Sequence, residues 1–226
     1  MINIGFDVSI NSTAICLETS NTYHFFSCYV GFKESYMNSK TRCFNELKDV
    51  ETFEIIKLER QWKQLSKKDK NNYSLSEFIK LTDANKNVNI IENKINPYLI
   101  SANSISMEGF SYGSKGSSLI DIVGFTYILR NMISRYKNLT IVSPSQVKKY
   151  AGRNSDQKTG NANKEQMFDL FLQQSDSKLQ SSKLWKTVKG NIDGFKRNLK
   201  SGIKIKTPLD DLIDSYFVLK SSGNNN

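Results

Sequence analysis

Acidic residues at three places in the 226-residue chain could bind divalent metal ions. Asp7 ends an alternating apolar segment at residues 2–7, and Glu108 ends a later short apolar segment. Near the C-terminus, Asp211 and Asp214 are spaced i, i+3 on a predicted helix, so both side chains can point toward one site. Carboxylates without histidine or cysteine suit Mg²⁺ or Mn²⁺. Two such ions, about 4 Å apart, are a standard arrangement for in-line phosphodiester cleavage.

Each of these acidic residues also has a purely structural interpretation. Asp7 could be an ordinary turn residue, and Glu108 could be an ordinary residue at the rim of a sheet. Asp210 and Asp211 could simply favour the N-terminus of a helix, because the helix dipole attracts acidic residues there. Asp210 lies four residues before Asp214 and could replace Asp211. The choice of ligand between Asp210 and Asp211 therefore stays open.

The elements that must position these residues alternate between strands and helices. The apolar alternation of residues 2–7 predicts a strand, and residues 13–17 and 23–30 extend it into an antiparallel meander. Residues 54–62 fit either a strand or a helix. The remaining predicted elements are strands at 104–108 and 139–142 and helices at 73–85, 88–99, 119–136, 163–174 and from 207 onward. This order predicts a mixed α/β fold.

The charge of the chain points to a polyanionic partner. Lys and Arg total 32 against 22 Asp and Glu, which gives a formal net charge of +10. A basic surface of this kind is typical of proteins that bind nucleic acids. The alternative is that the excess lysine only solvates the surface, since abundant Asn and Lys also reflect AT-rich coding. Hydrophobic residues make up 38% of the chain, which excludes a fully disordered protein.

Composition and length exclude several other classes. No stretch approaches 18 uninterrupted apolar residues, so no transmembrane helix is predicted. No basic region precedes an apolar run at the N-terminus, so we expect no signal peptide and a cytoplasmic location. Three cysteines without CxxC spacing and one histidine exclude a structural zinc site. The length predicts one domain, residues 1–226, with an extended segment at about 33–103 and a basic insertion at about 176–206.

Four motifs in order resemble the RuvC-type Holliday junction resolvases, a family of the RNase H-like (retroviral integrase) superfamily. The motifs are Gly5-Phe6-Asp7-Val8-Ser9 with Thr13, Met107-Glu108-Gly109-Phe110, Val142-Ser143-Pro144-Ser145-Gln146-Val147-Lys148-Lys149-Tyr150 with Asn161-Ala162-Asn163-Lys164-Glu165-Gln166-Met167, and Asp211-Leu212-Ile213-Asp214-Ser215. The resemblance covers residues 1–30 and 104–220. Any one motif is weak, whereas four in the right order and at similar spacing are specific.

The resemblance implies an RNase H-like fold, with a five-stranded mixed sheet in the order 3-2-1-4-5 flanked by helices. It also implies a crossover junction endodeoxyribonuclease that uses two Mg²⁺ or Mn²⁺ ions per active site. The substrate would be branched double-stranded DNA and the enzyme a homodimer, with the helix at 119–136 on the family's subunit-packing element. The family's catalytic metal ligands correspond to Asp7, Glu108, Asp211 and Asp214.

Residues expected to contact DNA come from the resemblance and from the positive charge. Lys148 and Lys164 fall on basic positions of the family near DNA, whereas Phe110 and Tyr112 only flank the position where the family places an aromatic residue. The full expected set is Phe110, Tyr112, Lys148, Lys149, Arg153, Lys158, Lys164, Lys186 and Lys189. Residues 176–206 could form either a DNA-tracking arm or a solvated helical hairpin whose aromatic residues dock on the core.

Two other functions share part of this pattern. Sugar-kinase and actin-type ATPases also begin with a strand, an aspartate and a turn, but they need a second lobe and a second phosphate motif, which this chain lacks. An RNase H-like module that binds nucleic acid without cleaving it is the other alternative. The complete set of carboxylates argues against such a module.

Overall fold

The structure of the protein is a computed structural model that describes residues 1–9, 12–30, 39–110, 117–152, 162–199 and 202–223. Its strands are β1 (Asn3–Asp7), β2 (Ser12–Glu18), β3 (Tyr23–Val30), β4 (Phe53–Leu58), β5 (Ser104–Glu108), β6 (Leu139–Val142), β7 (Lys196–Leu199) and β8 (Gly202–Ile205). Its helices are α2 (Phe44–Leu47), η1 (Gln61–Gln64), α3 (Lys67–Asn71), α4 (Tyr73–Ile100), α5 (Ser117–Ser134), α6 (Pro144–Ala151), α7 (Lys164–Leu172), α8 (Ser177–Ser181), α9 (Lys183–Gly190), α10 (Ile192–Phe195) and α11 (Leu209–Ser222).

The main sheet has six strands in the order β4-β3-β2-β1-β5-β6. β1, β2 and β3 form the predicted antiparallel meander, and β5 and β6 continue parallel to β1. The segment β3-β2-β1-β5-β6 therefore has the order 3-2-1-4-5 expected for an RNase H-like fold, and the predicted mixed α/β class, with a helix-flanked mixed sheet, is confirmed. Because β1, β3, β4, β5 and β6 run in one direction, their carboxyl ends meet at the same edge of the sheet.

The expectation of a five-stranded sheet is corrected by β4, which pairs parallel to β3 at the edge of the sheet. This strand comes from the segment at 54–62, which the sequence left open between strand and helix. Its burial alternates irregularly, with Phe53, Ile56 and Leu58 inside and Glu54 and Lys57 exposed, as suits an edge strand that is partly solvated. The chain then leaves the sheet through η1.

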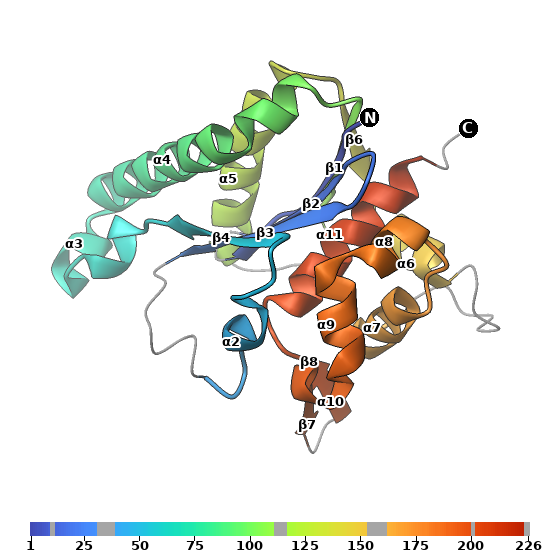
Figure 1. Cartoon of the computed structure of the whole chain (residues 1–226). Helices are drawn as coiled ribbons and strands as arrows, with labels where there is room; N and C mark the ends of the chain where they lie inside the picture. Colours follow the sequence, from blue (N-terminus) through green and yellow to red (C-terminus); the bar gives the residue numbers. More distant parts are fainter. Residues whose placement is uncertain (10–11, 31–38, 111–116, 153–161, 200–201, 224–226) are drawn as a thin grey trace.

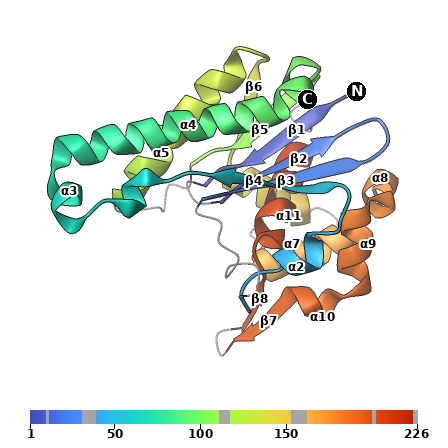
Figure 2. The ribbon, with the colours of Figure 1, turned by 60° about the vertical axis from the view of Figure 1, so that its left-hand side comes forward.

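Helices cover both faces of the sheet (Figure 1). α4 and α5 lie on one face, and α11, α6, α7 and the short helices α8 to α10 lie on the other (Figure 2). Adjacent residues of the central strands supply the two cores in turn: Ile15 and Leu17 of β2 join the α4–α5 core, and Ala14 and Cys16 join the α11 core. This alternation follows from the strand period of two. The central strands are consequently buried on both sides.

The helices predicted at 73–85 and 88–99 form one continuous helix, α4, which includes Pro97 near its end. α4 packs along α5 and buries much of the apolar surface of the helix predicted at 119–136. Ile120 and Tyr127 of α5 nonetheless remain 70% and 59% exposed. None of the helices in the described part of the chain combines the length and apolar character that a membrane span requires.

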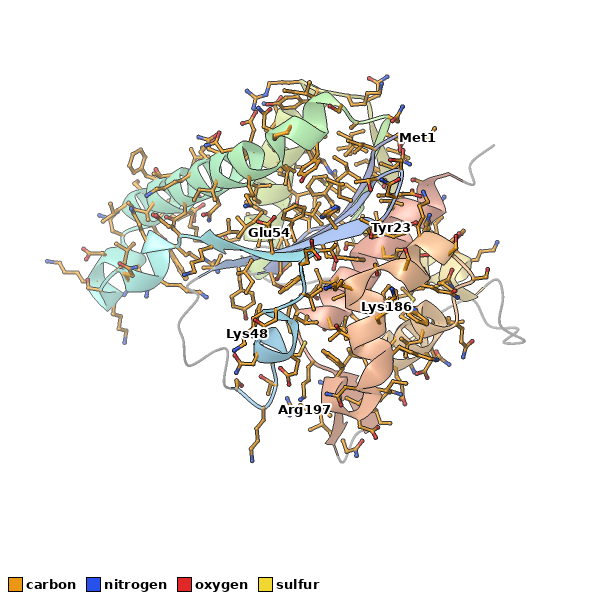
Figure 3. The ribbon with its side chains drawn as sticks, in the orientation of Figure 1. Met1, Tyr23, Lys48, Glu54, Lys186 and Arg197 are labelled. Carbon is orange, nitrogen blue, oxygen red and sulfur yellow. The ribbon has the colours of Figure 1, made fainter. Side chains whose placement is uncertain are left out.

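The described part of the basic stretch at 176–206 folds as the short helices α8, α9 and α10 and the antiparallel strands β7 and β8, so it is not a simple helical hairpin. Phe195 is fully buried and Trp185 packs partly against the same core. Several of its lysines pair with acids of other elements: Lys178 with Glu18, Lys183 with Glu51, Lys196 with Asp169 and Lys206 with Glu46. Lys186 and Arg197 lie on the face of the molecule that carries α8 to α11 (Figure 3).

The closest packing between a helix and the sheet is at Gly5 in β1. A β-carbon at this position would lie 2.5 Å from the Leu219 Cβ and 2.5 Å from the Ser215 carbonyl oxygen. Contacts this short do not occur between real side chains, so only glycine lets α11 lie against β1. The first residues of α11 are those that carry Asp211 and Asp214, and Gly5 therefore controls where these carboxylates lie.

We predict that Gly5→Ala lowers the free energy of unfolding by about 3 kcal/mol or more, because overpacking a tight contact displaces the helix. Gly124→Ala is the matched control, since nothing lies within 4 Å of the β-carbon that alanine would add there, and alanine favours a helix by about 1 kcal/mol over glycine. Urea denaturation of the two variants measures the difference. Equal stability of Gly5→Ala and wild type would contradict the assigned contact.

Candidate metal centre

The carboxyl ends of β1 and β5 place two acidic side chains next to each other. The strands are parallel neighbours, with Phe6 opposite Met107, so Asp7 and Glu108 follow directly at the same edge of the sheet. The first turns of α11 reach this edge as well and bring Asp211 and Asp214, whose side chains are 19% and 18% exposed. The structure therefore brings together all four carboxylates that the sequence predicted as a cluster.

Lys164 provides a positive charge inside this acidic cluster. It is the first residue of α7, whose start is fixed by a capping box between Asn163 and Gln166. The Lys164 ammonium group hydrogen-bonds to Asp214 and lies 3.9 Å from Asp211 Oδ1. Its side chain is still 49% exposed, so the ammonium group remains within reach of solvent and of a ligand.

Burial and mutual repulsion shift the pKa of every carboxyl in the cluster upward. Burial is the largest cause for Asp7, followed by the charges of Asp214, Asp211 and Glu108, and the pKa of Asp7 lies well above its usual value. Burial and the charge of Asp210 raise the pKa of Asp211 to about 7, against the opposing effects of Lys164 and a 2.9 Å hydrogen bond donated by Ser12 Oγ.

Glu108 and Asp214 show the same upward direction. Burial and the charge of Asp214 raise the pKa of Glu108, while a hydrogen bond from Asp7 and the charges of Lys164 and Lys148 oppose the rise. Burial raises the pKa of Asp214 despite its contact with Lys164. All four carboxyls therefore resist ionisation. A cation bound beside them would stabilise their ionised form.

Asp210 occupies a different position from its neighbour Asp211. It lines an open cleft between the start of α7 and β8, together with Asn163, Lys164 and Ile203. The largest charge effects on the pKa of Asp7 come from Asp214, Asp211 and Glu108, whereas the charge of Asp210 acts on Asp211, Asp214 and Lys164. One helix residue corresponds to about 100° of rotation, which is why two adjacent aspartates face different surroundings. The geometry therefore groups Asp211, rather than Asp210, with Asp7.

The donor set fits hard divalent cations, although the side chains are not arranged around a single point. Four carboxylates supply oxygen atoms, which Mg²⁺ and Mn²⁺ prefer. Among the described residues, no three acidic, histidine or cysteine side chains converge closely enough to coordinate one ion as they stand. Lys164 occupies part of the space between Asp211 and Asp214. Coordination would thus require the lysine to turn toward solvent.

The residues expected to contact DNA are only partly grouped around this cluster. Lys148 is exposed, and its charge acts on Glu108 and Asp214. Lys149 is exposed on the same helix, α6. Lys186 and Lys189 are exposed on α9. The lysines that affect the pKa values of Glu108 and Asp214 are Lys164 and Lys148, not these two. Tyr112, Arg153 and Lys158 lie outside the described residues.

Phe110 packs beside α5, a contact that the sequence motifs did not predict. The Arg130 guanidinium lies 4.8 Å from the centre of the Phe110 ring and 5.5 Å from that of Tyr127. Two nitrogen atoms of Arg130 are buried without a hydrogen-bond partner. Neither Arg130 nor Ser12 was predicted as a site residue. Ser12 had a weak signal, as a hydroxyl residue directly before the strand predicted at 13–17, whereas Arg130 had none.

Comparisons with known proteins give only distant similarities. No family model matches the chain, and no curated protein sequence matches it. It is similar to the Thermus thermophilus RuvC structure at 11% identity and a TM-score of 0.43, over 98% of this chain and 92% of that one. It is also similar to T. thermophilus RuvC in complex with Holliday junction substrate, at 10% identity and a TM-score of 0.42, over 98% and 91%. With TM-scores below 0.5, neither similarity bears on what this chain does.

We predict that the metal-free protein loses stability as pH rises from about 5 to about 7.5. Because the folded pKa values of the cluster are raised, the native state binds more protons than the unfolded state in this window, and stability falls with pH. The expected loss is on the order of 1–3 kcal/mol. Urea denaturation in chelator at several pH values measures it, and Asp211→Asn should flatten the dependence.

A second charged cluster provides the internal control for this pH prediction. The pKa values of Glu18 and Asp176 are lowered, chiefly by hydrogen bonds that oppose their burial, so their stabilisation is lost only as pH falls below about 4. They do not titrate in the window above. Stability that stays constant or rises between pH 5 and 7.5 would contradict the raised pKa values at the metal centre.

Proposed function

We propose that this protein is a metal-dependent endodeoxyribonuclease that cleaves phosphodiester bonds in four-way or otherwise branched double-stranded DNA. The observation that supports it most is the convergence of Asp7, Glu108, Asp211 and Asp214, each with a raised pKa, at one edge of the sheet. Four carboxylates offset by one principal lysine leave an excess of negative charge. Bound Mg²⁺ or Mn²⁺ ions would balance that excess.

Two ions held by these carboxylates would polarise the scissile phosphate and stabilise the charge on the attacking and leaving oxygens. The chain itself would contribute orientation: Asp7 and Glu108 extend from the rigid centre of the sheet, and Ser12 fixes one oxygen of Asp211 through its hydrogen bond. Lys164 is exposed enough for its ammonium group to turn from Asp214 to a phosphate oxygen. Lys148 would add a second cation beside Glu108.

The substrate assignment is supported by the charge around the site. The net charge of +10 favours a polyanion, and the predicted contacts Lys148, Lys149, Lys164, Arg153 and Lys158 belong to one segment of the chain. Lys186 and Lys189 on α9 would extend contacts to phosphates farther from the cut. Branched rather than linear DNA is implied by the sequence motifs alone. We place the reaction in DNA recombination or repair in the cytoplasm.

We predict that Asp7→Asn and Asp214→Asn each lower the cleavage rate by several orders of magnitude, because each removes a charged ligand while preserving its shape. Binding of a four-way junction should survive or tighten, since repulsion of the phosphates declines. Single-turnover cleavage and a binding titration measure the two effects. Near-normal cleavage by both variants in Mg²⁺ would contradict the proposed function.

Asp210 supplies a matched control on the same helix. Asp211→Asn should abolish cleavage and weaken Mn²⁺ binding, measured by calorimetry, whereas Asp210→Asn should retain both because its side chain faces the cleft beside β8. The opposite result would reassign the ligand to Asp210. A four-way junction, a flap and a linear duplex, run beside an ATP hydrolysis assay, separate the nuclease from the two alternative functions.

A homodimer is the second part of this proposal. Leu81 of α4 and Ile120 of α5 line one groove and are 55% and 70% exposed, and Phe78 on α4 is 64% exposed. Apolar patches of this kind are uncommon on the surface of monomers. A second copy that packs there would give a two-fold assembly, which matches the approximate symmetry of a four-way junction.

We predict that the protein sediments at twice its chain mass of 25.8 kDa at micromolar concentration. Ile120→Asp combined with Leu81→Asp should give a monomer, because two charges would then have to be buried in the interface. Substitution of Tyr73, which is 79% exposed but not part of the groove, serves as control. A wild-type monomer with and without DNA would refute the dimer.

A further inference from the structure

The segment between β4 and α4 forms an exposed, positively charged corner at the edge of the sheet where Asp7 and Glu108 lie. This basic corner comprises residues 59–71, with η1 and α3. Since β4 is parallel to β1, its carboxyl end points to the same edge as Asp7, and the corner continues from that end. Figures 1 and 2 show α3 beyond the sheet, at the free end of α4.

The corner has an excess of positive charge, of which the protein neutralises only a part: Arg60 lies 3.7 Å from the Asp121 carboxylate. Within residues 59–70, five side chains are basic and two are acidic. The two acids are engaged locally, Glu59 with Lys86 and Asp69 with the Ser66 hydroxyl. No acidic side chain in the described part of the chain pairs with the exposed lysines of the corner. These lysines are Lys63, Lys67 and Lys68.

A tryptophan concentrates further positive charge at the corner. Cations of Arg60, Lys70 and Lys80 lie 5.4, 5.2 and 5.3 Å from the centre of the Trp62 ring. The face of an aromatic ring attracts cations, which holds these side chains close together despite their mutual repulsion. The pKa of Lys63 is lowered by partial burial and by the charge of Arg60. Arg60 and Lys80 are paired with acids, however: both lie near Asp121 of α5, at 3.7 and 3.0 Å, and Lys80 also lies 3.0 Å from Glu77 of α4. The charge left for a polyanion is therefore that of the exposed lysines.

The backbone of the corner is held rigidly, unlike that of an ordinary connection. The buried Asp83 carboxylate on α4 accepts hydrogen bonds from the Gln61 and Trp62 N–H groups at 3.0 and 2.9 Å. The buried Asn87 side chain bonds both the N–H and the carbonyl of Glu59. Trp62 Nε1 donates to Ser76 Oγ at 2.7 Å. The exposed lysines are thus presented from a fixed base, which lowers the entropic cost of binding.

The corner also lies at a distance that DNA can bridge. Three strand spacings separate β1 from β4, which corresponds to about 14 Å across the sheet. One turn of B-DNA is about 34 Å long. A duplex arm that leaves the carboxylate cluster toward β4 therefore reaches the end of that strand, from which the corner continues, within its first turn. By contrast, several lysines of the stretch 176–206 are already paired with acids.

We propose that the basic corner binds the phosphate backbone of a DNA arm outside the scissile position, through Lys63, Lys67 and Lys68. This inference rests on the proposed function and assigns a role to the extended segment at 33–103. The contacts are to phosphates, so they add affinity without reading sequence. They act on binding and leave the chemical step unchanged, because no corner residue touches the carboxylates.

The test compares two triple variants that remove equal charge. Lys63→Gln, Lys67→Gln and Lys68→Gln neutralise the corner. Lys48→Gln, Lys94→Gln and Lys137→Gln neutralise three exposed lysines outside the corner. Lys48 follows α2, Lys137 precedes β6, and Lys94 on α4 pairs with Glu54 of β4. The ligand is a four-way junction with arms longer than one helical turn, and binding is titrated at several salt concentrations in Ca²⁺, with cleavage measured separately in Mg²⁺.

The corner variant should bind about tenfold more weakly, and its salt slope should be smaller than that of wild type by about two to three units. Its cleavage rate at saturating DNA should match wild type, and Lys→Arg at the same three positions should restore the slope. Equal slopes for the corner variant and wild type, or an equal reduction in both variants, would overturn the inference alone. Absence of DNA binding or cleavage by wild type would instead overturn the proposed function.

Discussion

The approach of α11 to β1 at Gly5 is the contact on which the candidate site depends. A helix normally stays one side-chain layer away from a sheet, but the missing β-carbon lets the α11 backbone lie directly against the central strand. The first turns of the helix then reach the end of β1, where Asp7 lies. Asp211 and Asp214 could not approach Asp7 from a helix held at the ordinary distance. One glycine therefore sets the spacing of charges that come from opposite ends of the chain.

Bringing these carboxylates close together costs free energy because like charges repel. The charged groups at the two ends of α11 differ in how this repulsion is offset. At its C-terminal end, Lys220 pairs with Glu18 and Asp176, and the pKa values of both acids are lowered. This cluster is balanced, as charges buried for structural reasons must be. At the N-terminal end, four carboxyls with raised pKa values share Lys164. Such an imbalance at one place, while charges are balanced elsewhere, is the electrostatic feature on which the proposed metal site rests.

Local patterns in the sequence were sufficient to predict the acidic residues of the site, whereas their partners depend on tertiary structure. Strand alternation predicted that Asp7 and Glu108 end strands, and the i, i+3 spacing predicted one helix face. The choice between Asp210 and Asp211 required the rotation of α11 about its axis, which its first residues alone do not determine. The contact of Lys164 with Asp214 joins two helices that are distant in sequence, and no local pattern encodes it.

The described part of the segment predicted as extended, residues 39–103, shapes both one edge and one face of the sheet. It adds β4 to the edge of the sheet, and it covers the adjoining face with α4, which buries much of an apolar α5. Since β4 joins parallel to β3, the chain must leave the sheet at the carboxylate edge before α4 can return. The basic corner occupies that exit. Had β4 paired antiparallel, the same lysines would lie at the opposite edge, away from the four carboxylates. The direction of a single edge strand thus decides whether the basic corner and the carboxylates of the candidate site lie at the same edge of the sheet.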